Sequence, residues 1–196
     1  MSAVTHVWLV VGLGNPGKKY ERNRHNVGFV VAESLREDKG LPAPRDKFSG
    51  RFSRGDALAV LWPQTFMNLS GDCVQPAQAF LKIAPAQLIV VHDELDLPFG
   101  RVAVKIGGGH AGHNGLRSII ARLGTPDFVR VRVGVGRPPA SFQGDVADFV
   151  LADFDASERA ELPALVRRAR DAVYAVIDRG VDAAMTTVNQ TASKNK

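Results

Sequence analysis

The feature that most restricts the fold of this chain is an apolar strand that leads directly into a glycine-rich loop. Residues 7–11 are all apolar, and the loop that follows reads Gly12-Leu-Gly-Asn-Pro-Gly17. An uninterrupted apolar run of this length is typical of a central strand whose sheet is covered on both faces. The stretch therefore predicts a layered protein in which helices pack against a buried sheet.

Strands and helices are expected to alternate along the rest of the chain. Further strands are predicted at residues 48–52, 57–62, 87–91, 101–106 and 128–135. Apolar residues at helical spacing predict helices over residues 26–35, 71–83 and 116–123, and a long one from residue 158 to a stop at Gly180. This order predicts an α/β fold, in which residues 1–196 form a single domain with a twisted mixed β-sheet flanked by helices.

Local features refine this outline. Pro76 predicts a kink in its helix or a later start, because proline lacks the amide hydrogen that a helix interior uses. Basic and apolar residues alternate over 101–106 and 128–135, which predicts that each strand exposes one polar face. Residues 39–45 are expected to form a loop, and the polar tail 191–196 is expected to fray.

Composition limits the class of protein. The chain has 196 residues, of which 45% are hydrophobic and 23% charged, as in an ordinary globular protein. No apolar run approaches the roughly 20 residues of a membrane span, and no signal-peptide pattern is present, so we expect a cytoplasmic protein. The single cysteine, Cys73, excludes an internal disulfide and is expected to be a small buried residue. A net charge of +5 favours a polyanionic partner.

The glycine loop also matches a dinucleotide-binding fingerprint. Gly12, Gly14 and Gly17 have its spacing after a strand. Such a site requires a helix whose first amides hold the pyrophosphate, whereas Pro16 removes one amide from this loop. Glu33 lies at the distance of the ribose-binding acid but falls within a predicted helix. The pattern therefore indicates a shaped loop, and no nucleotide cofactor is expected.

Polar side chains gather after the predicted core strands, where α/β sheets form their sites. These residues are Asn15, His25, Asp93, His113 and Asn114, with Asn68 between apolar neighbours ahead of a helix. Each one alone has an ordinary structural alternative, such as a turn residue, a helix cap or a surface histidine. His92, His110 and His113 also lie near Asp93 in sequence, which suggests a metal site. However, no set of three ligands among them has the spacing of a recognised metal motif, so no metal is expected.

Taken together, the motifs resemble one family, the bacterial-type peptidyl-tRNA hydrolases. The blocks that carry the resemblance occur in the family's order over residues 7–187. They are Gly12-Leu-Gly-Asn-Pro-Gly17, Tyr20-x-x-Asn-Arg-His-Asn-x-Gly28, Thr65-Phe-Met-Asn-Leu-Ser-Gly71, His92-Asp-Glu-Leu-Asp-Leu-Pro98, Lys105-x-Gly-Gly-Gly-His-x-Gly-His-Asn-Gly-Leu-Arg117 and Val131-Arg-Val-Gly-Val-Gly136. Six coordinated motifs are far more specific than one glycine pattern.

The resemblance implies hydrolysis of the ester that joins a peptide to the 3′ end of tRNA, which recycles tRNA from stalled translation. It implies that His25 is catalytic and that Asp93 is the carboxylate paired with it. The substrate-binding positions that it implies are Asn15, Tyr20, Phe66, Met67, Asn68, His113 and Asn114. It also implies that Lys105 and Arg132 bind the tRNA 5′-phosphate, in a monomer that takes the acceptor stem and CCA end without a cofactor, a membrane or an obligate protein partner.

The chemistry of these residue types fits those roles. An aminoacyl ester is already activated, so an oriented water can open it without a metal or a covalent nucleophile. A neutral imidazole can take the proton of that water, and a paired carboxylate stabilises the imidazolium that forms. Asparagine amides can donate to a developing oxyanion or accept from peptide amides, so the division of their roles stays open.

One departure from the family pattern and one alternative function stand beside this interpretation. Ala103 stands where some family members carry a further lysine, which would leave more of the phosphate binding to Lys105 and Arg132. A catalytically silent RNA-binding module of the same fold would keep the basic surface and bind RNA in a salt-dependent manner, without turnover.

Overall fold

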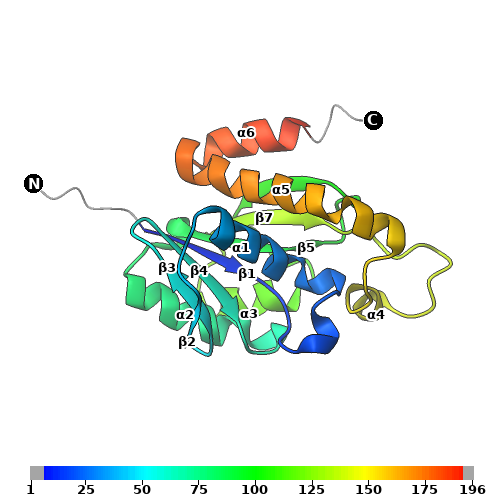
Figure 1. Ribbon diagram of the computed structural model, residues 1–196, viewed down its shortest axis with the longest axis horizontal. Helices are drawn as coiled ribbons and strands as arrows, with labels where there is room; N and C mark the ends of the chain where they lie inside the picture. The colour runs from blue at the N-terminus through cyan, green and yellow to red at the C-terminus, as the bar shows by residue number, and fades with distance from the viewer. Residues whose placement is uncertain (1–6, 192–196) are drawn as a thin grey trace, which may run out of the picture.

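Seven strands form one mixed sheet in the order β2-β3-β4-β1-β5-β7-β6 within the described part of the chain (Figure 1). The computed structural model describes residues 7–191, so residues 192–196 of the predicted frayed tail lie outside it. The strands are β1 (Trp8–Gly12), β2 (Arg45–Lys47), β3 (Gly50–Arg54), β4 (Leu58–Pro63), β5 (Leu88–Glu94), β6 (Val102–Ile106) and β7 (Val129–Gly134).

The central strands are parallel and the outer strands are antiparallel. β1 pairs in parallel with β4 and β5, and β5 pairs in parallel with β7. β3 and β2 extend the sheet antiparallel beyond β4, and β6 extends it antiparallel beyond β7. The predicted α/β fold with a mixed sheet is confirmed, and β3 and β4 form an antiparallel hairpin.

Helices cover both faces of the sheet (Figure 1). α1 (Val27–Asp38), α5 (Ala156–Arg179) and α6 (Val181–Thr191) pack on one face, while α2 (Ser70–Leu81) and α3 (Asn114–Leu123) pack on the other. The shorter elements are α4 (Val146–Val150) and the 3-10 helices η1 (Lys18–Tyr20), η2 (Arg24–Asn26), η3 (Met67–Leu69) and η4 (Pro85–Gln87). None of the helices within residues 7–191 has the length and apolar character needed to cross a membrane.

Two apolar cores lie on the two faces of the sheet. Along β5, Ile89 and Val91 contribute to the core beneath α1 and α5, whereas Leu88 and Val90 contribute to the core beneath α2 and α3. The continuous apolar pattern of this strand is therefore explained by burial on both sides. Cys73 lies in the second core, as expected, and burial raises the pKa of its thiol to about 12, so the thiol is protonated and inert near neutral pH.

The structure departs from the sequence-based expectations in several places. α4 and α6 were not predicted. α2 begins at Ser70 and contains Pro76, so the later helix start is wrong. The predicted strand over residues 48–52 begins only at Gly50, because Phe48 and Ser49 form a tight turn with φ values of 58° and 54°. The expected polar face of β7 is exposed only in part, since Arg132 is half-buried and Arg130 is 3% exposed beneath the glycine-rich loop.

Helix α1 approaches the sheet closely because the contact positions are glycines. A Cβ atom on Gly28 would overlap the carbonyl oxygen of Val91 and lie 2.5 Å from the amide nitrogen of Leu13. A Cβ atom on Gly12 would likewise overlap the carbonyl oxygen of Gly28. The start of α1, and with it the adjacent η2, is therefore seated directly against the ends of β1 and β5.

We expect Gly28→Ala to lower the free energy of unfolding by about 3 kcal/mol or more, because a methyl group there forces a central strand or α1 to move. Urea denaturation measures the change. Ser34→Ala, at a half-buried position of the same helix, is the matched control and should change stability by less than about 0.5 kcal/mol. A Gly28→Ala variant as stable as the control would show that the contact is not restrictive.

Candidate active site

A cleft of about 700 Å³ lies at the edge of the sheet where β1, β4, β5 and β7 end. Open α/β sheets form sites at this edge because the loops of parallel strands converge there. The sequence-predicted site residues that line the cleft are Asn15, His25, Phe66, Met67, Asn68, Asp93, Lys105, His113, Asn114 and Arg132. Tyr20, the remaining predicted residue, lies in η1 and does not belong to this lining.

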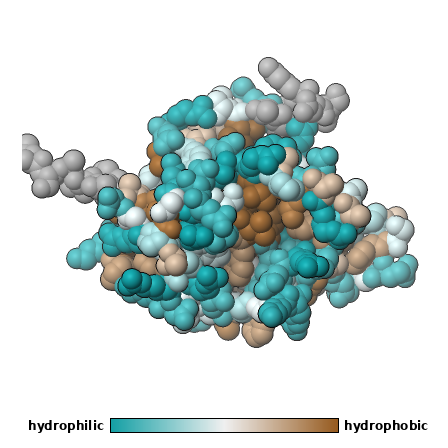
Figure 2. Space-filling view, viewed as in Figure 1, coloured by the Kyte–Doolittle hydropathy of each residue, from teal (hydrophilic) through white to brown (hydrophobic). Residues whose placement is uncertain are grey.

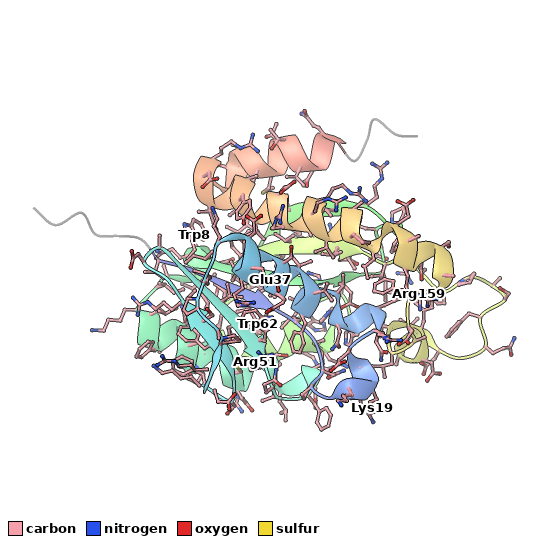
Figure 3. The ribbon with its side chains drawn as sticks, viewed as in Figure 1. Trp8, Lys19, Glu37, Arg51, Trp62 and Arg159 are labelled. Atoms are coloured by element: carbon pink, nitrogen blue, oxygen red, sulfur yellow. The ribbon has the colours of Figure 1, made fainter. Side chains whose placement is uncertain are left out.

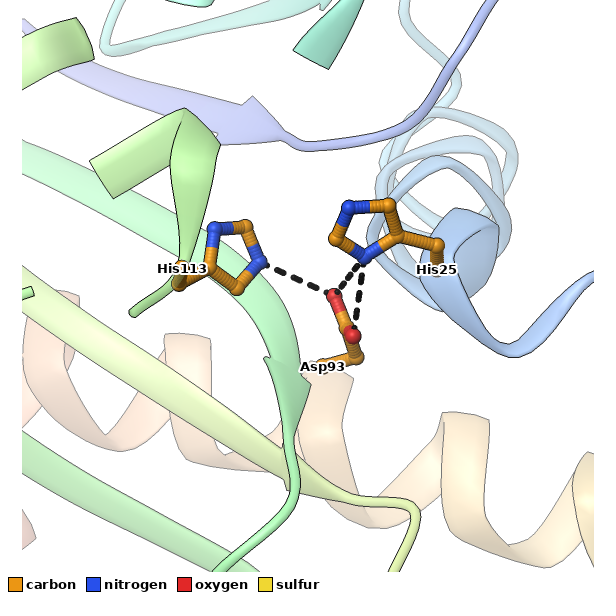
Figure 4. A group of neighbouring side chains, drawn as sticks. All are labelled: His25, Asp93 and His113. Carbon is orange, nitrogen blue, oxygen red and sulfur yellow. Dashed lines mark hydrogen bonds and ion pairs between the residues drawn. The ribbon is translucent and has the colours of Figure 1, made fainter. Parts of the chain in front are cut away.

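A buried carboxylate joins two imidazoles in the cleft (Figure 4). Both oxygens of Asp93, a residue 4% exposed, accept from Nδ1 of His25 at 2.9 Å. Its Oδ1 also accepts from Nε2 of His113 at 3.0 Å. His25 belongs to η2 and His113 directly precedes α3, so three separate segments of the chain meet at one side chain.

The other hydrogen bonds of these rings determine where their protons lie. Nδ1 of His113 accepts from the backbone N–H of Gly115 at 3.1 Å and of Leu116 at 3.4 Å, and it thereby caps α3. A nitrogen that accepts carries no proton, so the proton of neutral His113 is on Nε2, facing Asp93. By the same reasoning Nδ1 of His25 donates to the carboxylate, which leaves its Nε2 as an unprotonated acceptor.

Asp93 and His25 shift each other's ionisation. Burial opposes the charged form of Asp93, but the two imidazoles outweigh burial and hold the pKa of this carboxyl well below its ordinary value. Burial lowers the pKa of His25, whereas the charge and hydrogen bond of Asp93 raise it, and the net pKa lies above the ordinary value of 6.5. The arrangement is a carboxylate that is ionised near neutral pH beside an imidazole that can accept a proton in the same range.

His92 supports the backbone of this pair. Its Nδ1 donates to the carbonyl oxygen of Asp93 at 2.7 Å, and its ring meets the ring of His113 edge-on, with 5.0 Å between centroids. Burial is the main cause that lowers the pKa of His92 to about 3, so it is neutral. The sequence suggested His92 only as a metal ligand; its contact with the backbone of its neighbour has no sequence signal.

The histidines and the carboxylate also offer three atoms of the kind that bind metals. The ligand atoms of His25, Asp93 and His113 lie within 4.8 Å of one another. A metal on Nε2 of His113 would move that ring's proton to Nδ1, which would break the hydrogen bonds from Gly115 and Leu116. The donor set therefore fits a hydrogen-bonded triad better than a metal centre.

Asn15 is held from two sides. Its backbone N–H donates to Oδ1 of Asn26 and its carbonyl oxygen accepts from Nδ2 of Asn26, both at 2.9 Å. The backbone N–H of Met67 donates to Oδ1 of Asn15 at 2.8 Å. Because this oxygen is occupied, the NH₂ group of Asn15 is the part that remains for a ligand. α1 begins only at Val27, so the glycine loop presents Asn15 and not a helix N-terminus.

The other two asparagines lie at more exposed positions. Asn68 is part of η3, so its alternative role as an N-cap is wrong. Asn114 is the first residue of α3, and its Oδ1 accepts from Nη2 of Arg117 at 2.7 Å. Phe66, a residue that is 58% exposed, belongs to the same cleft lining.

Lys105 and Arg132 share one face of the neighbouring strands β6 and β7. The register pairs Ala103 with Arg132 and Lys105 with Arg130, and residues two apart on a strand point to the same side. Arg132 is paired with Glu94 at 2.9 Å, whereas Lys105 forms no ion pair within residues 7–191. The expected phosphate-binding cations are therefore adjacent, but only Lys105 has an uncompensated charge.

Arg130 fastens the glycine-rich loop that leads to His113. Its Nη1 donates to the carbonyl oxygen of Gly109 at 2.6 Å and its Nη2 to that of Gly108 at 2.5 Å. These bonds explain why the guanidinium of Arg130 on β7 is buried.

The cleft also has an apolar wall that the sequence did not reveal. Val146 and Val150 of α4, together with Leu151, line it, and Val146 and Leu151 are 42% and 41% exposed. The one local signal for α4 is the capping box formed by Asp145 and Asp148.

A second hollow, of about 480 Å³, lies on the face shown in Figure 2, where apolar side chains gather between α1 and α5. Its lining includes Phe29, Trp62 and Arg51, with Glu37 of α1 beside them (Figure 3). No histidine lines this hollow, so the groups that can exchange protons near neutral pH belong to the first cleft.

Comparisons with known proteins agree on one family. Residues 9–196 match the family model described as peptidyl-tRNA hydrolase. A protein of that name from Sorangium cellulosum is 57% identical over 185 residues, covering 92% of this chain and 83% of that protein. Another from Mycobacterium tuberculosis is 49% identical over 186 residues, covering 92% and 96%. The crystal structure of peptidyl-tRNA hydrolase from Acinetobacter baumannii is 37% identical and superposes with a TM-score of 0.86, covering 96% of this chain and 97% of that one.

We expect Asp93→Asn to lower the pKa of His25 from above 6.5 to below 6.5, because burial continues to oppose the imidazolium while the stabilising charge is gone. An NMR titration of the imidazole resonances measures the shift. Asp96→Asn, which removes an exposed carboxylate three residues away that is paired with Arg137, should leave the pKa of His25 unchanged. A fall of equal size in both variants would indicate a general loss of negative charge instead of a specific pair.

Proposed function

The chain belongs to the peptidyl-tRNA hydrolase family and hydrolyses peptidyl-tRNA, and from this premise we propose that His25 is the general base of the reaction and Asp93 its partner. The observation that carries the proposal is the buried contact of Nδ1 of His25 with both oxygens of Asp93, at 2.9 Å. This contact leaves Nε2 of His25 to take a proton, as in a catalytic triad without its serine.

In the proposed reaction, a water held by Nε2 of His25 attacks the ester carbonyl carbon. Nε2 takes one proton from the water while Asp93 stabilises the imidazolium, a contribution of about 10²–10⁴-fold. The bond between the carbonyl carbon and the 3′-oxygen of the ribose then breaks, and the imidazolium returns the proton to that oxygen. The products are tRNA and a peptide carboxylic acid, which releases its remaining proton to solvent to become the carboxylate, and His25 is neutral again.

We propose that Asn15 and Asn114 act as hydrogen-bond donors to the substrate. The side-chain oxygen of each already accepts a hydrogen bond, from Met67 and Arg117 respectively, so their NH₂ groups remain. A donor placed at a developing oxyanion contributes roughly 3 kcal/mol to transition-state stabilisation. Asn68 makes no side-chain hydrogen bond within residues 7–191, and both ends of its amide are suited to the peptide backbone. Phe66 and Met67 would contact the apolar parts of the peptide.

Lys105 and Arg132 are proposed to bind the 5′-phosphate of the acceptor stem while the CCA end enters the cleft. Lys105 lies opposite Arg130, which lies opposite Val90, three residues before Asp93 on β5. At about 3.3 Å per residue and about 4.8 Å between strands, the backbone of Lys105 is on the order of 14 Å from that of Asp93. This separation suits a contact with a part of the tRNA remote from the ester, since an ammonium and a guanidinium both pair well with phosphate.

We propose that the protein acts as a single-domain monomer in the cytoplasm. There it would recycle the tRNA that stalled translation leaves attached to a peptide. The groups assigned to catalysis come from one chain, and an activated ester needs no cofactor. Tyr20 lies outside the cleft lining, so a substrate contact there would be with a part of the tRNA or peptide that extends beyond the cleft.

We expect His25→Ala to reduce kcat for release of peptide from peptidyl-tRNA by about 10²–10⁴-fold, because the water loses its base. In the native protein, kcat/KM should rise with pH with a midpoint above 6.5, since the neutral imidazole is the active form and Asp93 raises its pKa. His110→Ala, which removes a histidine that forms no hydrogen bond with Asp93 within residues 7–191, is the matched control. A His25→Ala variant with native activity would contradict the assignment, and a native protein that binds tRNA without turnover would be the silent RNA-binding module.

We expect Lys105→Gln to raise KM for peptidyl-tRNA by about tenfold, to reduce the salt dependence of tRNA binding, and to leave hydrolysis of a minimal peptidyl-nucleotide ester unchanged. Steady-state kinetics on both substrates measures the difference. Arg54→Gln removes an exposed arginine of β3 outside the cleft lining and controls for net charge. Equal losses on the long and the minimal substrate would count against a remote phosphate contact.

A further inference from the structure

We infer that Arg24 is a positioning residue. It fixes the position of His25, the proposed base, relative to the apolar wall of the cleft formed by Val146, Val150 and Leu151. The inference rests on the proposed role of His25, the next residue in η2. Arg24 is only 6% exposed, and an arginine is rarely buried to this extent unless its guanidinium is paired. Its partners all come from a segment more than a hundred residues away in sequence.

The guanidinium of Arg24 connects two parts of that segment. Its Nη1 lies 3.4 Å from the carbonyl oxygen of Phe149, 3.3 Å from that of Ala152 and 2.9 Å from that of Asp153. Its Nη2 forms an ion pair with Oε2 of Glu158 at 2.5 Å. The guanidinium carbon also lies 4.2 Å from the centre of the Phe149 ring. The end of α4 and the start of α5 are therefore bound to one planar group.

The carboxylate of Glu158 has a second role at the same place. Its Oε2 accepts from the backbone N–H of Asp155 at 2.8 Å, which completes the capping box that begins α5. The next residue, Arg159, donates from Nη1 to the carbonyl oxygen of Phe154 at 2.6 Å; Figure 3 labels Arg159 near the start of α5. Through Glu158, the position of Arg24 is thus tied to the first turn of the long helix.

Backbone contacts extend the connection to the base itself. The N–H of Arg24 donates to the carbonyl oxygen of Ala152 at 3.2 Å, and the N–H of Phe154 donates to that of Arg22 at 3.4 Å. Residues 22–24 therefore run alongside residues 152–154, and His25 follows directly. A shift of the arginine would move the backbone of the base.

The same shift would move the apolar wall. Val146, Val150 and Leu151 line the cleft, and Phe149 between them offers its carbonyl oxygen and ring to Arg24. A lysine would keep the charge but not the planar arrangement of N–H donors, because one ammonium cannot reach Glu158 and the three carbonyl oxygens in the same geometry. Arg24 thus acts on the reaction through His25 and α4, without touching the reacting atoms.

The test compares kcat and KM of Arg24→Lys, Glu158→Gln and the double variant on peptidyl-tRNA. We expect Arg24→Lys to reduce kcat by about tenfold with little change in KM for the tRNA, because a small displacement of the base affects the chemical step. Glu158→Gln keeps a side-chain oxygen for the N–H of Asp155 and should reduce kcat by about threefold. The double variant should lose no more than Arg24→Lys, since the two side chains act as one unit.

Arg170→Lys is the matched control. Arg170 pairs with Asp38 at 2.9 Å and links α5 to α1 away from the cleft. The Arg170→Lys variant should have a lower stability, measured by thermal unfolding, and an unchanged kcat, measured on the folded protein. Native kcat in Arg24→Lys, or a loss equal to that of Arg170→Lys, would overturn the inference, as would fully additive losses in the double variant.

Two further outcomes separate this inference from the proposed function. Should Arg24→Lys fail to fold by circular dichroism, Glu158→Gln decides: reduced kcat supports the positioning role and native kcat overturns it. A fully active His25→Ala variant would remove the proposed base, whereas an inactive His25→Ala variant beside a native-like Arg24→Lys variant would overturn only the role of Arg24.

Discussion

The buried charge of Asp93 is the constraint on which the rest of the site depends. A carboxylate that is 4% exposed is stable only where hydrogen-bond donors replace the water it has lost. His25 and His113 are those donors, and they come from η2 and from the start of α3. The charge therefore specifies how three segments assemble on the end of β5. The contacts that keep it ionised are also the contacts that orient the proposed base.

The sequence predicted the centre of the fold because continuous apolar runs permit few arrangements. β1, β5 and α1 lie within a few residues of their predicted ranges. The site residues followed from family motifs, but their contacts did not. One nitrogen of His113 faces a carboxylate 20 residues earlier in sequence and the other caps the helix that it precedes. No local pattern encodes both partners, and the pairing of Arg132 with Glu94 on the neighbouring strand is equally non-local.

What the sequence missed has physical reasons that differ from element to element. α4 has five residues, too few for a helical period to be visible. α6 keeps apolar residues at helical spacing, at Val181, Ala184, Met185 and Val188, but it directly follows the stop at Gly180 that was correctly predicted for α5. The burial of Arg24 and Arg130 runs against the usual behaviour of arginine, and each is explained only by carbonyl oxygens that the fold brings from elsewhere.

Because β4, β1, β5 and β7 run in the same direction, their carboxyl ends lie on one side of the sheet and their amino ends on the opposite side. The connections that precede these strands, at residues 55–57, 84–87 and 124–128, contribute nothing to the cleft lining. Changes of length or composition there do not alter the residues that line the cleft. The same connections are where a fluorophore or a surface tether could be attached to a working enzyme.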